Sequence, residues 1–329
     1  MEIMSNIQRI YAFIFVSCFM SSAHAQKPEG LPGNYPAKTV RIIIASNPGG
    51  ALDISGRIVG QKLTERWGTN FVAENRAGTG IAYDLVSKAA PDGYTLMVSS
   101  TSIMYTSYGV LKPSYDVRTK FPPIAQFIAA PFIVAVTPSL PVNSMKELIA
   151  YAKANPNVIN YSYSGIGSAA QLAGELLKLI AKVDIVGIPH SGVGPGYIEQ
   201  MAGRIHMTIG TAASAMPLVR AGKIRAIAVT TTKRAKALPD LPAITETLPT
   251  FDNIDVWVGL LGVEGMPQSM IAALNKEVNT ILQLPEVTKV LTADGSETTP
   301  TTPEQFRKVI AQVLESTDRI VRDAGIQLK

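Results

Sequence analysis

A loop type that recurs along the chain constrains its fold more than any other feature. A glycine-rich turn follows an apolar run and opens into a helical pattern, first as Asn47-Pro48-Gly49-Gly50 after residues 40–45. Two further copies have the same setting and read Ser164-Gly165-Ile166-Gly167-Ser168 and Ser191-Gly192-Val193-Gly194-Pro195-Gly196. Such turns can direct free backbone N–H groups, at the positive end of a helix dipole, toward an anion. Several of them facing one cleft would capture an anionic small molecule without any catalytic side chain.

Apolar runs alternate with helical patterns along the chain, which predicts an α/β architecture with mostly parallel sheets. We expect helices at about 54–66, 196–202 and 216–221 and a strand at 132–137, among others. Ser144 precedes Glu147 with the spacing of a capping box, which predicts a helix start. The Pro-rich stretch 233–250 is expected to connect elements and not to pack.

The order of these elements predicts a chain that enters one α/β unit, passes through a second and returns. We therefore expect one domain formed by residues 35–132 plus 258–329, and another formed by 133–257. Ligand clefts in such folds lie at the carboxyl ends of the strands. The hinge is expected where strands cross, near 132–134 and 256–259.

The first 25 residues have the pattern of a secretory signal peptide. A polar start is followed by an apolar core at 10–20 and by Ala23-His24-Ala25, so that cleavage is expected between Ala25 and Gln26. The only cysteine, Cys18, is an alternative lipid-anchoring site, but it lacks the leucine-led motif before it. We expect a periplasmic protein without a thiol for a disulfide, a nucleophile or a metal.

The net charge and the aromatic content count against a nucleic-acid partner. The net charge of +5 is mild and dispersed, and only 7% of the residues are aromatic, so that a nucleic-acid surface is not expected. The excess indicates weak attraction for acidic ligands. No later stretch has the length of a membrane span, and transport would therefore need membrane subunits supplied by other chains.

The first loop has two interpretations. Pro48, Gly49 and Gly50 follow the first strand, where they form either an anion site or an ordinary tight turn. Asp53 is either a ligand-site residue or, as is more common in a first helical turn, a cap for free N–H groups.

The second glycine turn is an incomplete dinucleotide fingerprint. Gly165 and Gly167 would need a third glycine where Ala170 stands, so that no nicotinamide cofactor is expected. The hydroxyl groups of Ser164 and Ser168 could still donate hydrogen bonds to a carboxylate.

The mature chain has only two histidines. His190 ends a predicted strand beside the third glycine turn and is expected to line the cleft, whereas His206 is expected at the solvated surface. The sequence has neither Gly-x-Ser-x-Gly nor a metal-protease motif, which counts against the rival interpretation as a secreted α/β hydrolase or transferase. We expect neither a metal nor a cofactor.

A set of short motifs runs in order along nearly the whole mature chain and resembles one known family. They are Tyr35-Pro36-Ala37-Lys38, Pro48-Gly49-Gly50-Ala51-x-Asp53, Glu74-Asn75-Arg76-Ala77-Gly78, Ala90-Pro91-Asp92-Gly93-Tyr94, Pro138-Ser139-Leu140-Pro141, Leu172-Ala173-Gly174-Glu175, Ala221-Gly222-Lys223-Ile224-Arg225-Ala226, Ala237-Leu238-Pro239-Asp240-Leu241-Pro242 and Asp323-Ala324-Gly325. Together they resemble the substrate-binding proteins of tripartite tricarboxylate transporters, the group named after the Bordetella uptake gene.

The resemblance implies a type II-like periplasmic binding protein, a monomer whose two α/β domains close on a ligand and which delivers it to a membrane permease. It also implies that cleft loops hold the ligand's carboxylate by backbone amides and hydroxyls. Carried over by position, the site residues are Pro48, Gly49, Gly50, Asp53, Thr79, Gly80, Ser164, Gly165, Gly167, Ser168, His190, Ser191, Gly192, Val193, Thr211 and Ala212.

Some positions depart from the family pattern. His190 stands where tyrosine is usual, and Thr211 lies in a stretch that usually carries an Asp-Asn pair. Losing an acid and gaining an imidazole suggests a ligand with more negative charge, or one without an amine. An alternative role, a ligand sensor for a signalling partner, has the same sequence features as a transport receptor.

Overall fold

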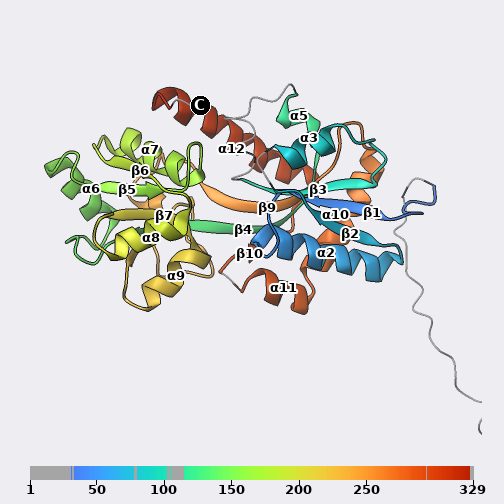
Figure 1. Ribbon diagram of the computed structural model, residues 1–329, viewed down its shortest axis with the longest axis horizontal. Coiled ribbons are helices and arrows are strands. Elements are labelled where there is room, and N and C mark those ends of the chain that lie inside the picture. The colour runs from blue at the N-terminus through green and yellow to red at the C-terminus, as the bar shows by residue number, and fades with distance from the viewer. Residues whose placement is uncertain are drawn as a thin grey trace, which may run out of the picture.

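The computed structural model describes residues 31, 33–77, 80–101, 104, 115–293 and 295–326. Helices and strands gather in two groups at the ends of an elongated molecule, and long strands run between them (Figure 1). The predicted signal peptide lies outside the described residues. Within the described ranges, no helix has both the length and the hydrophobicity needed to cross a membrane.

The first sheet has the strand order β2-β1-β3-β9-β4, with the short β10 paired to β4. Its strands are β1 (Val40–Ile44), β2 (Phe71–Asn75), β3 (Thr95–Ser100), β4 (Pro123–Val136), β9 (Asp255–Leu261) and β10 (Glu297–Thr298). The helices grouped with it are α2 (Ala51–Trp67), α3 (Ile81–Ser87), α5 (Val117–Lys120), α10 (Gln268–Leu282), α11 (Pro285–Leu291) and α12 (Pro303–Asp323).

The second sheet has the order β4-β7-β5-β6, with β8 also paired to β4. Its further strands are β5 (Asn160–Tyr163), β6 (Val186–Pro189), β7 (Met207–Thr211) and β8 (Arg225–Val229). Its helices are α6 (Met145–Ala154), α7 (Ala169–Ala181), α8 (Val193–Met201) and α9 (Ala212–Arg220), with the short 3-10 helix η1 (Ile244–Glu246). As predicted, Ser144 caps α6, because its hydroxyl accepts from the N–H of Glu147.

Strand β4 belongs to both sheets. Its residues up to Pro131 pair with β9, whereas Phe132 and the residues after it pair with β7 and β8. The change of partners between Pro131 and Phe132 is the point where the chain passes from one sheet to the other, near the centre of the molecule (Figure 1).

The prediction of mostly parallel sheets is wrong. Among the described strands, β1 with β2 and β3, and β5 with β6 and β7, pair in parallel. Every pairing that involves β4 or β9 is antiparallel. Strand β4 carries the chain from the first sheet into the second, and β9 brings it back into the first sheet, where the two strands run in opposite directions.

Several predicted boundaries also differ from the structure. Helices α2, α8 and α9 begin at Ala51, Val193 and Ala212, three or four residues before their expected starts. The predicted starts are late because the first turns of these helices contain small residues, so that the sequence shows little hydrophobic periodicity there. The predicted strand 132–137 is only the end of β4, whose prolines Pro123 and Pro131 concealed the first part.

The stretch 233–250 was expected to connect elements without packing, and this is wrong for its middle part. Ala243 is buried in a small core under α9, together with Tyr197 and Ile133, and Leu238 and Leu241 pack against this core. The stretch therefore covers one side of the second sheet.

Helix α12 links the two groups of elements. It packs on β4, the strand that both sheets share, and against α7 of the second group. In Figure 1 it crosses above the centre of the molecule. Phe306 of α12 stacks edge-on against Trp257, with 5.1 Å between ring centroids. A Cβ on Gly259 would lie under 3.0 Å from the Phe306 ring, so that this glycine permits the close approach of the helix.

Candidate functional site

A cavity of about 460 Å³ lies between the two sheets, a volume typical of small-molecule sites. It is lined at the carboxyl ends of β3, β5 and β7, at the starts of four helices, and on the two crossing strands. The lining residues are Ala51, Leu52, Ser100, Phe132, Ser162, Tyr163, Ser164, Ser168, Ala169, Ala170, Val193, Ile209, Gly210, Thr211 and Val256.

Four helix N-termini converge on this cavity. Ala51 begins α2, Ala169 begins α7, Val193 begins α8, and Thr211 is the N-cap of α9. In α2, α8 and α9 no side chain caps the first turn, which leaves N–H groups available there. The four dipoles together give the cavity a positive potential that favours an anion.

The polar side chains of the cavity are neutral. Among the described lining residues, none carries a charge, and hydroxyl groups come from Ser100, Ser162, Tyr163, Ser164, Ser168 and Thr211. Ser168 also caps α7, because its hydroxyl accepts from the N–H of Gln171. A carboxylate in this cavity would therefore be held by backbone N–H groups, hydroxyls and helix dipoles, without an ion pair.

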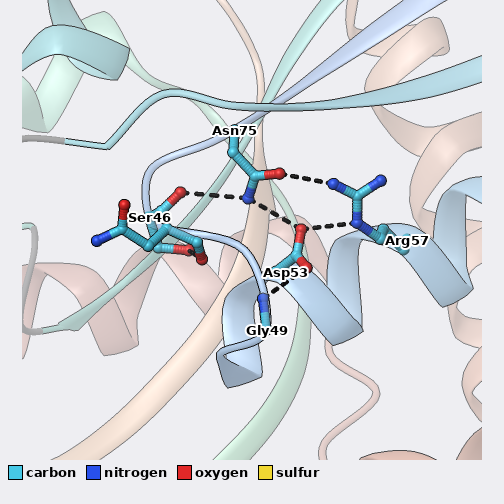
Figure 2. A network of polar contacts seen from close by, with 6 residues as sticks. Ser46, Gly49, Asp53, Arg57 and Asn75 are labelled. Atoms are coloured by element: carbon cyan, nitrogen blue, oxygen red, sulfur yellow. Dashed lines mark hydrogen bonds and ion pairs between the residues drawn. The ribbon is translucent and has the colours of Figure 1, made fainter.

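Asp53 holds the first glycine loop in place (Figure 2). Its buried carboxylate accepts hydrogen bonds from the Gly49 N–H at 2.9 Å, Asn75 Nδ2 at 2.9 Å and Arg57 Nε at 2.8 Å. Burial tends to raise the pKa of Asp53, but these hydrogen bonds and the charge of Arg57 lower it below the usual 3.8. Asp53 thus fixes the start of α2 and is not among the residues that line the cavity.

The structure brings only part of the predicted site together. Ser164, Ser168, Val193 and Thr211 line the cavity. Thr79 lies outside the described residues. The other predicted residues are not among those that line it: Pro48, Gly49, Gly50, Asp53, Gly80, Gly165, Gly167, His190, Ser191, Gly192 and Ala212. The glycine loops therefore shape the cavity, and the residues just before and after them form most of its surface.

Sequence reasoning missed most of the apolar surface. Ala51, Leu52, Ala169 and Ala170 directly follow the predicted loops, and reading one helical turn past each loop would have found them. No such signal exists for Ser100, Phe132 and Val256. They reach the cavity only because β3, β4 and β9 meet at the centre of the structure.

His190 does not line the cavity. Its Nδ1 lies 3.1 Å from the Ile188 carbonyl oxygen and 3.0 Å from the hydroxyl of Ser162, which does line it. A bond to the carbonyl requires a proton on Nδ1, so that this nitrogen cannot act as a base for the serine. His190 therefore positions Ser162, and the contact lacks the chemistry of a hydrolase pair.

His206 is not fully solvated as expected. Its Nδ1 lies 2.8 Å from Asn160 Oδ1, and partial burial lowers the pKa of the imidazole. In the part of the chain that the structure describes, no cluster of His, Cys, Asp or Glu could hold a metal ion.

Solved structures share this fold. The structure of a periplasmic transporter is 33% identical, with a TM-score of 0.72, and the match covers 90% of this chain and 100% of that one. An adipate-bound protein from R. palustris is 32% identical, with a TM-score of 0.73 and coverages of 89% and 99%. MatC from Rhodopseudomonas palustris, with bound malate, is 28% identical, with a TM-score of 0.68 and coverages of 88% and 100%. These matches confirm the predicted periplasmic binding protein fold.

Proteins with similar sequences show the family to which the chain belongs. BugT of Bordetella pertussis is 30% identical, and the match covers 98% of this chain and all of that protein. The model of the "Tripartite tricarboxylate transporter family receptor" matches residues 56–326. The resemblance seen in the sequence motifs is thereby confirmed: the chain belongs to this receptor family, whose members bind substrates and are not enzymes.

Proposed function

We propose that the protein is a periplasmic receptor that captures a small organic anion through a carboxylate and delivers it to a membrane permease made of other chains. The observation that carries this proposal is the convergence of α2, α7, α8 and α9 on one cavity. Their N-termini supply N–H donors and positive potential in a setting that excludes competing charges. The adipate and malate found in two similar structures support a carboxylate ligand.

Capture proceeds by closure of two domains, residues 35–132 plus 258–329 and residues 133–257. The ligand favours the closed state because it contacts Ala51 and Leu52 of one domain and Ser164 and Thr211 of the other only when they approach. One hinge strand passes through Phe132, where β4 changes partners. Because residues 255–257 of β9 pair with residues 129–131 of β4 in the first sheet, we place the second hinge just before Asp255, and not at 256–259, so that residues 255–257 move with the first domain.

The proposal is tested by measuring which acids bind the mature chain. A thermal-shift screen of mono-, di- and tricarboxylates, amino acids and neutral amides should find at least one acid that raises the melting temperature, because ligand bound to the folded state stabilises it by mass action. Calorimetry then gives the affinity. If neutral amides or amino acids bind more tightly than every acid, the proposed ligand class is wrong.

A charge placed at a helix start tests the anion site itself. Ala51→Asp adds a carboxylate at the first position of α2, where acidic residues favour helix stability, so that the fold should be retained. The bound acid should lose about tenfold or more in affinity through like-charge repulsion. The uncharged control Ala51→Asn has the same shape and should change affinity far less. Equal losses in both variants would contradict an electrostatic site.

Processing and location are tested separately. Mass spectrometry of the protein from a periplasmic extract should give a chain that begins at Gln26. A chain that retains residues 1–25, or one modified on Cys18, would contradict the proposed export route.

A further inference from the structure

We infer that the protein has a second ligand site, beside the hinge, which takes a small organic ammonium compound. The site is a cavity of about 640 Å³, which we call the hinge cavity, between α12 and the segment that leads into β9. This volume lies within the range of small-molecule sites. The hinge cavity is separate from the cavity between the sheets, where the acid is proposed to bind.

Strand β9 separates the two cavities. Val256 lines the cavity between the sheets, whereas its neighbour Asp255 lines the hinge cavity. Successive side chains of a strand point to opposite faces, so that the two cavities lie on opposite sides of β9. Trp257 is two residues after Asp255 and stacks against Phe306, which places α12 on the same side as the hinge cavity. Among the described residues, none lines both cavities.

Both proposed domains contribute to the hinge cavity. Thr232, Phe251 and Asp252 come from the second domain. Gln126 of β4, Asp255 of β9 and one face of α12 come from the first. An occupant of the hinge cavity would therefore contact both domains beside the point where we place the hinge.

The charge of the hinge cavity is negative, although the whole chain carries a net charge of +5. Three lining side chains are carboxylates, those of Asp252, Asp255 and Glu315, and one is the guanidinium of Arg319. Arg319 forms an ion pair with Asp252, so that its charge is already balanced. In the part of the chain that the structure describes, neither Asp255 nor Glu315 has a basic partner. Two unbalanced carboxylates favour a cation over an anion.

Two buried polar groups that line the hinge cavity have hydrogen bonds left unmade. Asn253 donates to the carboxylate of Asp255, but Oδ1 of this carboxylate is buried without a partner, and burial raises its pKa. Gln126 is 4% exposed, and its side chain makes one hydrogen bond among the described residues, from Nε2 to the Ile128 carbonyl at 3.5 Å. Buried polar groups rarely lack partners. The free groups here are acceptor oxygens, which suit a ligand with N–H donors.

A small organic ammonium compound matches these features. An ammonium group brings a positive charge and three donors to the unbalanced carboxylates. The apolar side chains of Phe251, Val309 and Val313 suit a short hydrocarbon body, because burying it removes apolar surface from water. An inorganic cation fits less well, since the described residues contain no cluster of His, Cys, Asp or Glu that could hold a metal ion.

Calorimetry with matched ligands tests the inference on the mature chain. Butylammonium and putrescine carry the proposed group, whereas butanol has the same four-carbon chain without a charge. At neutral pH and low ionic strength at least one amine should bind, and butanol should bind at least about tenfold more weakly. If neither amine binds at concentrations up to about 10 mM, or if butanol binds as tightly, the inference is wrong.

Carboxylate variants locate the bound amine. Glu315 is exposed on α12, so that Glu315→Gln should retain the fold and weaken amine binding by about threefold or more. Asp255→Asn keeps the shape of the side chain, removes the buried charge and should weaken binding by about tenfold or more. The matched control is Glu304→Gln, an exposed carboxylate of the same helix that does not line the hinge cavity and should leave binding unchanged.

Equal affinities of the unmodified chain and all three variants would place the amine elsewhere and overturn the inference. Circular dichroism checks that each variant is folded. If Asp255→Asn does not fold, the comparison of Glu315→Gln with Glu304→Gln decides the question, and equal affinities of these two variants then refute the site.

Discussion

Asp53 offers a quantitative test of how the first loop is held. The variant Asp53→Ala removes the acceptor for the Gly49 N–H and for the Asn75 amide, two hydrogen bonds to an ionised group at about 1.5 kcal/mol each. The ion pair with Arg57 adds at most about 1 kcal/mol, because the arginine side chain is half exposed. We therefore expect the free energy of unfolding to fall by about 3–4 kcal/mol at neutral pH.

The pH dependence of this loss has a definite sign. Since the pKa of Asp53 in the folded chain lies below its usual 3.8, the carboxylate contributes its full stability above that value. The contribution is lost as the pH falls through the lower, folded-state pKa. The difference between the unmodified protein and Asp53→Ala should thus be constant from about pH 7 to pH 5 and should shrink only below about pH 4.

Urea denaturation followed by circular dichroism measures both quantities. The matched control is Glu65→Ala, which removes an exposed carboxylate of the same helix that bonds to Lys62 and Gln61, and which should cost about 0.5 kcal/mol or less. The reasoning is refuted if Asp53→Ala costs no more than the control. It is also refuted if the difference persists unchanged to about pH 3.

Three further variants test the walls of the cavity and its surroundings. In Gly210→Ala the new Cβ would lie under 3.0 Å from the Tyr197 hydroxyl, so that the free energy of unfolding should fall by about 1–3 kcal/mol. Adding Tyr197→Phe to the same chain removes this hydroxyl and should restore part of the lost stability. Gly174→Ala should destabilise α7 by a similar amount or more, because its Cβ would meet the buried Tyr161 ring, and a gain of stability in urea would contradict this packing. His190→Ala should weaken ligand binding by about tenfold or less in calorimetry, since the ring acts through the cavity serine; complete loss of binding would assign the ring a direct contact.

Local features of the sequence predicted much of the fold. Ser144 indicated the start of α6, and the structure confirms the cap. The glycine turns correctly indicated strand-to-helix transitions at β1 and β5, because turn residues and N-caps act within a few positions of the chain. The family landmarks, spread over the whole mature chain, identified the receptor family that the comparisons show.

Long-range pairing was not predictable in the same way. The first part of β4 contains Pro123 and Pro131, which read as breaks, and only its neighbours β9 and β7 make the segment a continuous strand. Strand direction also depends on which distant segments meet, so that the antiparallel pairings of β4 and β9 have no local signature.

Asp53 shows where the sequence left a choice open. A carboxylate in a first helical turn can face a ligand or bind loop N–H groups, and both interpretations have the same local sequence. Asn75 comes from the next strand of the sheet, and its amide, with the Gly49 N–H and Arg57, engages the carboxylate (Figure 2).

The sequence by itself determined an α/β receptor with glycine-rich loops at the carboxyl ends of its strands, since periodicity and turn chemistry are properties of neighbouring residues. The tertiary structure decided which groups face the ligand. Ser100, Phe132 and Val256 are far apart in the chain and share one cavity because β3, β4 and β9 pair at its centre. This pairing places four helix starts around one cavity with apolar walls, and the described residues that line it carry no charge.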